Sequence, residues 1–76
     1  MLKIKDNVDL KTLKKLGFKK SKIYSKGVLV DIYTTKYGTI DVRCDTRRIY
    51  IYTDDKEEIF DFFQSGLVEK VRELYE

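Results

Sequence analysis

The side chains best suited to acid–base or metal chemistry are the four carboxylates of the segment DDKEE at 54–58. They would attract a cation, but their spacing matches no calcium-binding loop. Asp54 precedes Glu57 by three residues, and Asp55 precedes Glu58 by three, which is the spacing of a helix capping box. We therefore predict the start of a helix here and no metal ligands.

Other reactive side chains are scarce. Histidine is absent, which removes the commonest general base and metal ligand. The single cysteine, Cys44, falls on the core-facing positions of a predicted strand, so we expect a small core residue and not a nucleophile. Each of the four glycines fits a turn or a helix end, and none belongs to a phosphate-binding loop. The sequence predicts no catalytic residue and no cofactor, and we expect a protein that is not an enzyme.

The length of 76 residues allows one domain, over 1–76, with one small core. The composition is 42% hydrophobic and 38% charged, which is typical of a soluble globular domain. A lone cysteine cannot form an internal disulfide, and the N-terminus has no apolar stretch of signal-peptide length. No segment has the length and hydropathy to span a membrane. These features favour the cytoplasm and argue against a membrane partner.

Charge is divided unevenly along the chain. Residues 1–53 hold 13 Lys and Arg against 5 Asp, a net charge of +8, whereas residues 54–76 hold 3 against 8 acidic residues, a net charge of −5. The simpler interpretation is a basic surface and an acidic helix on one compact body. The alternative is that each half suits a partner of opposite sign, including a second copy of the chain. Mimicry of nucleic acid by the acidic C-terminal helix stays open.

The N-terminal part predicts a short extended segment followed by a helix. Within residues 1–7, Leu2 and Ile4 lie on one side of the extended segment. Asp9 is a favourable N-cap, and Gly17 fits the left-handed position that ends a helix. The apolar stripe of this helix consists of Leu10, Leu13 and Leu16, and its exposed face consists of Lys11, Lys14 and Lys15.

Four strands are predicted next, at residues 19–25, 28–35, 39–45 and 48–53. The tetrapeptide SKGV at 25–28 indicates a tight hairpin turn, and KYG at 36–38 suits a three-residue loop. Alternation assigns one set of residues to the core: Val28, Val30, Ile32, Ile40, Val42, Cys44, Ile49 and Ile51.

The three-residue loop at 36–38 fixes the register of the second and third strands. It pairs Thr35 with Thr39, and the same ladder sets Tyr33 opposite Asp41. Tyr33 then points to the open side of the sheet.

Two registers are compatible with the third and fourth strands. One pairs Cys44 with Ile49 and leaves a four-residue loop at 45–48. The other has a two-residue loop at 45–46 and sets Arg43 against Arg48. We favour the first, because like charges directly opposite each other are unfavourable.

The C-terminal part predicts a helix that begins at Asp54 or Asp55. Its apolar residues are Ile59, Phe60, Phe62, Phe63, Leu67, Val71 and Leu74. Gly66 either ends this helix or forms a weak point within it, and we expect a break or kink there with a second helical segment to about Tyr75. The predicted fold is a two-layer α+β domain with an N-terminal helix, a four-stranded antiparallel β-meander and a C-terminal helix.

Both predicted helices cover the same face of the sheet, so the other face is open. The candidate partner-binding residues on this face and its rim are Lys20, Lys22, Tyr33, Arg43, Arg48, Tyr50 and Tyr52. Tyrosine and arginine are enriched at protein-interface hot spots, and tyrosines interleaved with basic residues resemble platforms for single-stranded nucleic acid. Asp31 and Asp41 argue against nucleic acid. A merely solvated face and a homodimer through this open face are the other interpretations.

Three segments carry a resemblance: NVDLKTLKKLGFK at 7–19, DTRRIYIYT at 45–53 and FFQSGLVEKV at 62–71. Together they resemble a group of small uncharacterised proteins of phages and prophages of Gram-positive bacteria. The resemblance implies no assigned activity and no functional residues. It implies a context in which a small phage domain binds and blocks a host protein, such as a CRISPR effector or another defence component. We therefore expect a non-enzymatic domain that binds a host protein in the host cytoplasm, with a small nucleic-acid-binding protein as the alternative.

Overall fold

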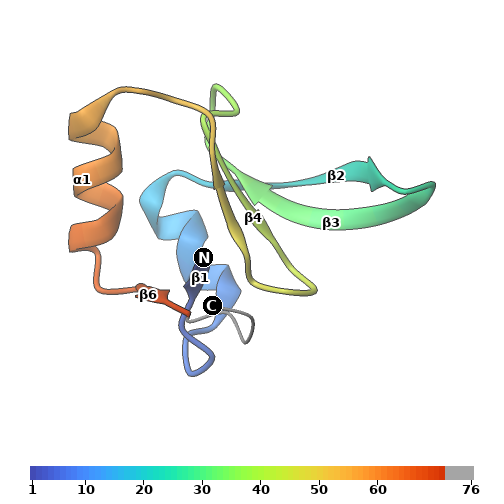
Figure 1. Ribbon diagram of the computed structural model, residues 1–76, viewed down its shortest axis with the longest axis horizontal. Helices are drawn as coiled ribbons and strands as arrows, with labels where there is room; N and C mark the ends of the chain where they lie inside the picture. Colours follow the sequence, from blue (N-terminus) through green and yellow to red (C-terminus); the bar gives the residue numbers. More distant parts are fainter. Residues whose placement is uncertain (72–76) are drawn as a thin grey trace.

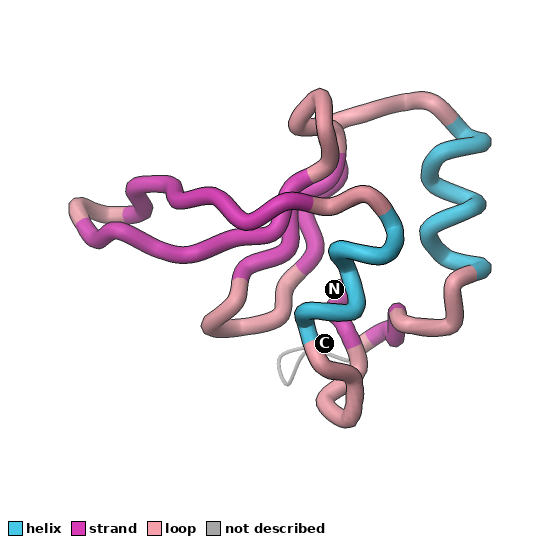
Figure 2. The backbone as a smooth tube through the Cα atoms, turned by 180° about the vertical axis from the view of Figure 1, so that it is seen from behind, coloured by secondary structure: helices cyan, strands magenta, loops and turns pink. Residues whose placement is uncertain are grey.

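The computed structural model describes residues 1–71, and residues 72–76 lie outside the described part. The elements follow in the order β1 (Leu2–Ile4), η1 (Leu10–Leu16, a 3₁₀ helix), β2 (Lys19–Ser25), β3 (Val28–Thr34), β4 (Ile40–Arg43), β5 (Ile49–Ile51), α1 (Lys56–Gln64) and β6 (Val68–Lys70). The strands form two antiparallel sheets, β1–β6 and β2–β3–β4–β5. Figures 1 and 2 show the helices on one side of the larger sheet and the β2–β3 hairpin extending away from them.

The fold is a small β-rich domain, so the predicted two-layer α+β domain with terminal helices is wrong. The four central strands do lie in the consecutive order of a meander. The elements themselves differ at the two ends of the chain, where the first helix is of another type and a strand follows the second helix in place of a further helical segment. No helix within residues 1–71 has the length and hydropathy needed to cross a membrane.

The N-terminal helix η1 is a 3₁₀ helix, although both of its ends were predicted from the sequence. The Asp9 carboxylate accepts a hydrogen bond of 2.9 Å from the Lys11 amide, and Gly17 ends the helix with φ 91°. The apolar stripe has a constant spacing of three residues, which matches the 3.0 residues per turn of a 3₁₀ helix. Only Leu13 of that stripe is fully buried. The helix therefore contacts the core along a narrow apolar stripe, which a 3₁₀ helix can supply.

The acidic segment begins α1 as expected, but the helix does not resume after Gly66. Asp55 is the N-cap, and its carboxylate accepts hydrogen bonds from the Glu57 and Glu58 amides at 3.1 and 3.3 Å. Gly66 has φ 80°, a left-handed conformation in which the helix cannot continue. Residues 68–70 then form β6, so the predicted second helical segment is wrong there. The rest of that prediction, including Leu74 and the end at Tyr75, lies outside the described residues.

Strand β6 exists because β1 offers it a hydrogen-bonding partner. Ile4 pairs with Val68 and Leu2 with Lys70. The Lys5 amide also donates to the Leu67 carbonyl at 2.9 Å. These partners are more than sixty residues apart in sequence, so the local apolar pattern contains no sign of the pairing.

The core lies between the base of the larger sheet, η1 and α1 (Figure 1). Its buried residues are Ile4, Leu13, Phe18, Tyr33, Ile40, Val42, Ile49 and Phe62. The rings of Phe18 and Phe62 lie 5.4 Å apart between centroids, which joins the end of η1 to α1. Cys44 packs against this cluster from a half-buried position.

The register between β3 and β4 differs by one residue from the prediction. Tyr33 lies opposite Val42, and Thr34 lies opposite Asp41. The connecting loop has four residues, 36–39, and the Thr35 hydroxyl accepts hydrogen bonds from the Thr39 and Ile40 amides at 2.9 and 3.2 Å. This side chain stabilises the longer loop by binding its backbone.

The one-residue shift exchanges the two faces of β3 relative to β4. Tyr33 joins the core beside Val42, whereas Val30 and Ile32, predicted as core residues of the same set, lie on the opposite face. Both are nevertheless buried. The prediction that Tyr33 faces open solvent is wrong.

The register between β4 and β5 is the one that the sequence disfavoured. Val42 lies opposite Ile49, and the Arg43 amide donates to the Arg48 carbonyl at 3.0 Å. The predicted pairing of Cys44 with Ile49 is therefore wrong. The repulsion expected at Arg43 is offset because its guanidinium donates to Asp45 at 2.7 and 3.0 Å.

The loop that joins β4 to β5 spans residues 44–47 and ends with Arg47 in a left-handed conformation, φ 64°. The Arg47 amide donates to the Arg43 carbonyl at 2.9 Å, which closes the loop. The Arg47 carbonyl accepts a hydrogen bond of 3.0 Å from the Ile4 amide. This loop therefore joins the larger sheet to the N-terminal strand.

Candidate functional site

The β2–β3 hairpin extends beyond the rest of the larger sheet (Figure 1). β2 and β3 form seven register pairs, from Lys19 with Thr34 to Ser25 with Val28. β4 pairs only with residues 32–34 of β3. Residues 22–31, which we call the distal hairpin, therefore form a two-stranded extension of the sheet.

The turn of the distal hairpin is built from two residues with positive φ. Lys26 has φ 51° and Gly27 has φ 78°. Two successive left-handed residues form a turn whose twist matches that of the flanking strands, which favours long and regular hairpins. The SKGV signal in the sequence is sufficient to place this turn.

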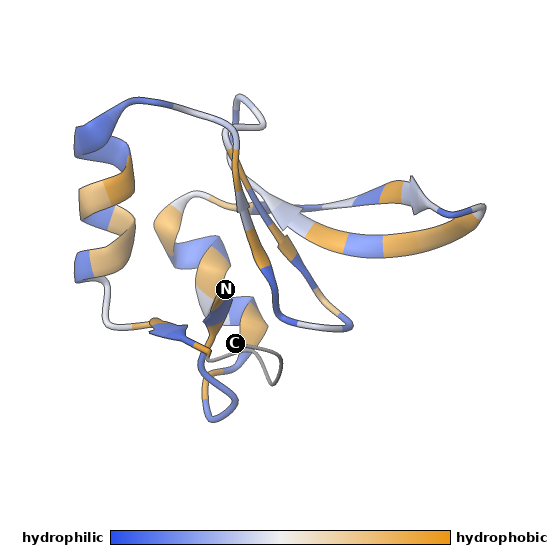
Figure 3. Cartoon of the chain, viewed as in Figure 1, coloured by the Kyte–Doolittle hydropathy of each residue, from blue (hydrophilic) through white to orange (hydrophobic). Residues whose placement is uncertain are grey.

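Apolar side chains are exposed on both faces of the distal hairpin. Tyr24 is 77% exposed and its cross-strand neighbour Leu29 is 50% exposed. On the opposite face, Val28 is 62% exposed and Ile23 is 37% exposed. Figure 3 shows hydrophobic residues continuing along β3 to the end of the hairpin.

Residues 43–45 lie beside part of the hairpin, where Val30 is buried and the Arg43 guanidinium is 3.4 Å from the Ser25 hydroxyl. The four exposed apolar side chains remain accessible to a partner.

The distal hairpin is also basic. Lys22 lies on the same face as Tyr24, and Lys26 occupies the turn. The Lys22 ammonium is 3.9 Å from the Asp31 carboxylate, with both side chains largely exposed. A surface pair at this distance contributes little to stability, so its lysine can exchange this partner for another at small cost.

Two of the predicted partner-binding residues lie on β2 and one lies in the core. Lys20 and Lys22 are exposed on β2. Tyr33 is 4% exposed and belongs to the core cluster. The tyrosine that was expected to join the two lysines on an open face is therefore buried.

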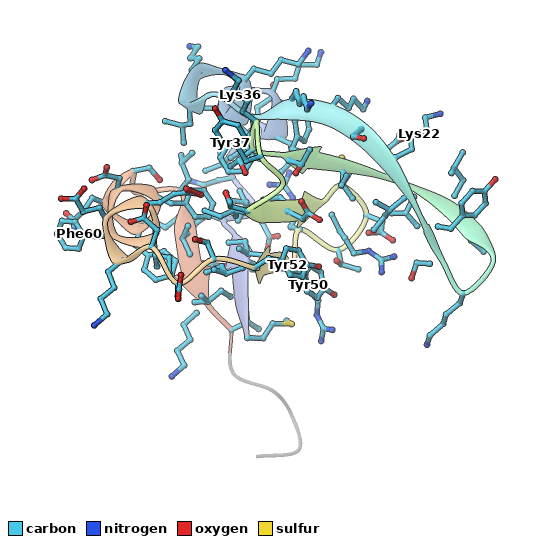
Figure 4. All side chains as sticks on the ribbon, turned by 90° about the horizontal axis from the view of Figure 1, so that it is seen from above. Lys22, Lys36, Tyr37, Tyr50, Tyr52 and Phe60 are labelled. Carbon is cyan, nitrogen blue, oxygen red and sulfur yellow. The ribbon has the colours of Figure 1, made fainter. Side chains whose placement is uncertain are left out.

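The remaining predicted residues lie away from the two lysines. Arg43 is opposite Ile32, and Tyr50 is opposite Asp41, which places both on the face that does not carry Lys20 and Lys22. Figure 4 shows Tyr50 and Tyr52 beside each other and apart from Lys22.

The backbone of Arg48, just before β5, forms an isolated antiparallel β-bridge with the backbone of Lys3. The seven predicted residues thus do not form one surface. Their roles in binding stay predictions.

One of the predicted partner-binding residues, Arg43, forms an ion pair with Asp45 at the β4–β5 loop. The hydrogen bond from Arg43 lowers the pKa of the Asp45 carboxyl, and the same hydrogen bond raises the pKa of Arg43. Arg43 Nη1 also lies 3.4 Å from the Ser25 hydroxyl. Its guanidinium therefore has partners within the chain.

Two observations concern the reactive side chains of the described residues. Burial raises the pKa of the Cys44 thiol, which favours the less nucleophilic protonated form. Within residues 1–71, no three His, Cys, Asp or Glu side chains are grouped so that they could hold a metal ion. The exposed apolar side chains of the distal hairpin are the candidate site that the geometry provides.

Comparison with known proteins finds no family model, no curated protein and no solved structure that matches the chain. The candidate site therefore depends on the geometry of this chain alone.

The sequence pattern did not single out the distal hairpin. The predicted strand lengths contained no signal for it, because a third strand at 39–45 in the predicted register would run beside the second strand as far as Leu29. The overhang arises because β4 ends at Arg43 and pairs only with residues 32–34 of β3.

Proposed function

We propose that this protein is a non-enzymatic protein-binding domain that contacts its partner through the distal hairpin. The observation that supports the proposal is the exposure of apolar side chains on both faces of a projecting hairpin. Burial of an apolar side chain against a partner contributes about 1.5–3 kcal/mol for Val, Leu, Ile or Phe. A hairpin inserted between two walls of a cleft would bury both faces together.

The lysines indicate the chemistry of the partner surface. Lys20, Lys22 and Lys26 accompany the apolar residues on or beside the distal hairpin, and Asp31 is the acidic residue among them. The complementary surface is an apolar cleft with an acidic rim. In the context that the phage resemblance implies, the partner is a host protein in the cytoplasm, and components of defence systems, CRISPR effectors included, are the first to test.

Affinity capture with matched variants tests this proposal. The chain is immobilised, and lysate proteins that it retains are identified by mass spectrometry. Tyr24→Asp with Leu29→Asp should abolish capture of the specific partner, because two charges replace the apolar contact. Tyr37→Asp is the matched control, since Tyr37 is 82% exposed on the β3–β4 loop.

A partner retained equally by the double variant would contradict the hairpin as the binding surface. Retention that is lost only with Tyr50→Ala and Tyr52→Ala would instead support the binding residues predicted from the sequence. Absence of any specific partner in lysates of candidate hosts would contradict the host-protein proposal.

Nucleic-acid binding is the second candidate, and the hairpin itself favours it. A two-stranded ribbon fits the major groove of DNA, and the lysines of β2 and its turn would lie near phosphates. Binding of labelled single- and double-stranded oligonucleotides is measured from low to physiological salt. A steep loss of affinity with salt, reduced by Lys22→Glu with Lys26→Glu, would support this function. No binding at low salt would exclude it.

A further inference from the structure

A groove lies at the opposite end of the molecule from the distal hairpin, between α1, the end of η1 and the β3–β4 loop. Its volume is about 370 Å³. Its apolar floor includes Leu16, Phe18 and Phe62, and its rim includes Glu57, Glu58 and Asp61. We call it the acidic groove. A volume of this size accepts side chains of a partner and exceeds the space of a few waters.

The rim of the acidic groove keeps negative charge that the chain itself does not neutralise. Glu58 accepts a hydrogen bond from the Thr39 hydroxyl, which leaves its charge in place. The ion pairs found in residues 1–71 do not include Glu57 or Asp61. No lysine or arginine of these described residues lines the groove. A cationic and partly apolar occupant therefore fits it.

The distal hairpin has this chemistry, but it cannot reach the groove of its own chain. Figure 1 shows α1 and the tip of the hairpin at opposite ends of the molecule, and Figure 4 shows Phe60 of α1 and Lys22 on opposite sides. The larger sheet lies between them. Contact between the two surfaces therefore needs a second copy.

We propose that the distal hairpin of one copy docks into the acidic groove of a second copy. Tyr24 or Leu29 contacts the apolar floor, while Lys22 and Lys26 lie beside the carboxylates of the rim. The two surfaces differ, so each contact is heterologous. It closes as a dimer when two copies exchange hairpins or as a ring of more copies, and otherwise it extends into an open chain. One hairpin end buries less area than a permanent interface, so the association is reversible and increases with protein concentration. The inference stands independently of a host partner, which would compete for the same hairpin.

Charge exchange between the two surfaces tests the inference with the purified full chain. The hairpin variant carries Lys22→Glu and Lys26→Glu, and the groove variant carries Glu57→Lys and Asp61→Lys. Sedimentation velocity over a range of protein concentrations measures the association of each variant and of their equimolar mixture. Circular dichroism verifies that each variant is folded.

Each variant alone should associate at least tenfold more weakly than the wild type, because like charges then meet at both contacts. The mixture should recover association, because the acidic hairpin of one variant meets the basic groove of the other and the remaining pair is unchanged. Lys11→Glu with Lys70→Glu makes the same charge change at exposed positions of η1 and β6 and should leave association within twofold of the wild type.

A wild-type chain that stays monomeric at millimolar concentration would overturn the inference. Association that both variants leave unchanged, or that the mixture fails to restore, would overturn it too. Because this experiment contains no host protein, its failure is distinct from failure of the capture experiment.

Discussion

Arg47 Nη1 donates a hydrogen bond of 2.7 Å to the carbonyl oxygen of Val8, which lies thirty-nine residues earlier in the chain. The same nitrogen donates to the Lys5 carbonyl at 2.8 Å. One side chain therefore satisfies two carbonyl groups of the segment between β1 and η1. Together with the hydrogen bond from Ile4 to the Arg47 carbonyl, it attaches the N-terminal segment to the β4–β5 loop.

Replacement of Arg47 should destabilise the fold, and the choice of residue separates two effects. Arg47→Ala removes both hydrogen bonds and should lower the free energy of unfolding by about 2–3 kcal/mol. Arg47→Gly removes them as well but relieves the left-handed backbone, so it should be less destabilising by about 1 kcal/mol. Urea denaturation measures both, with exposed Lys11→Ala as the control. Equal stability of the two variants would contradict backbone strain at this position.

The register between β3 and β4 is tested by truncating two tyrosines of the same hairpin. Tyr33→Ala should lower the free energy of unfolding by about 3–5 kcal/mol, because Tyr33 lies in the core beside Val42. Tyr24→Ala should change it by less than about 0.5 kcal/mol, because Tyr24 is exposed. Denaturant titrations of the two variants compare them directly. A small effect at Tyr33 would favour the register in which this tyrosine faces solvent.

Acid should weaken the interaction between Arg43 and Asp45. The hydrogen bond from Arg43 holds the folded-state pKa of Asp45 below its ordinary value of 3.8. A carboxyl with a lowered folded-state pKa stabilises the fold above its unfolded-state pKa, and this stabilisation is lost as pH falls through the folded-state value. Asp45→Asn should therefore lower the melting temperature at pH 7 and have a smaller effect at pH 2. The same decrease at both pH values would contradict the linkage.

The effect of Gly66→Ala on the free energy of unfolding distinguishes a turn from a continuous helix after α1. Gly66 has φ 80°, and a Cβ there would meet no atom within 4 Å, so strain alone decides the effect. Gly66→Ala should lower the free energy of unfolding by about 1 kcal/mol in this turn. In a continuous helix it would raise it by about 1 kcal/mol, because alanine has the higher helix propensity. Thermal or urea unfolding of the variant distinguishes the two outcomes.

Features that depend on a few neighbouring residues could be predicted from the sequence. The cap at Asp9, the helix end at Gly17 and the start of α1 after Asp55 are all observed. So is the turn at Lys26 and Gly27. Each of these depends on contacts within about four residues, and the sequence displays all the participants together.

The type of the first helix was mistaken although its caps were correct. Asp9 and Gly17 are compatible with both helix types, because they satisfy end groups that both share. The spacing of three between Leu10, Leu13 and Leu16 favoured the 3₁₀ form, but a short α-helix also tolerates it. Only Leu13 of the three leucines is fully buried, so the core does not cover the wider apolar face of an α-helix.

The sequence by itself determined the meander of four consecutive strands, the turn at Lys26 and Gly27, the helix caps, and the division of charge between the two halves of the chain. Tertiary structure alone decided the pairing of β1 with β6, the two strand registers and the faces on which Tyr33, Arg43 and Lys22 lie. These depend on distant partners and on loop side chains such as Thr35, and a shift of one residue exchanges the faces of a strand. For that reason the open tyrosine face expected from alternation does not form, and the exposed apolar surface lies at the end of the β2–β3 hairpin.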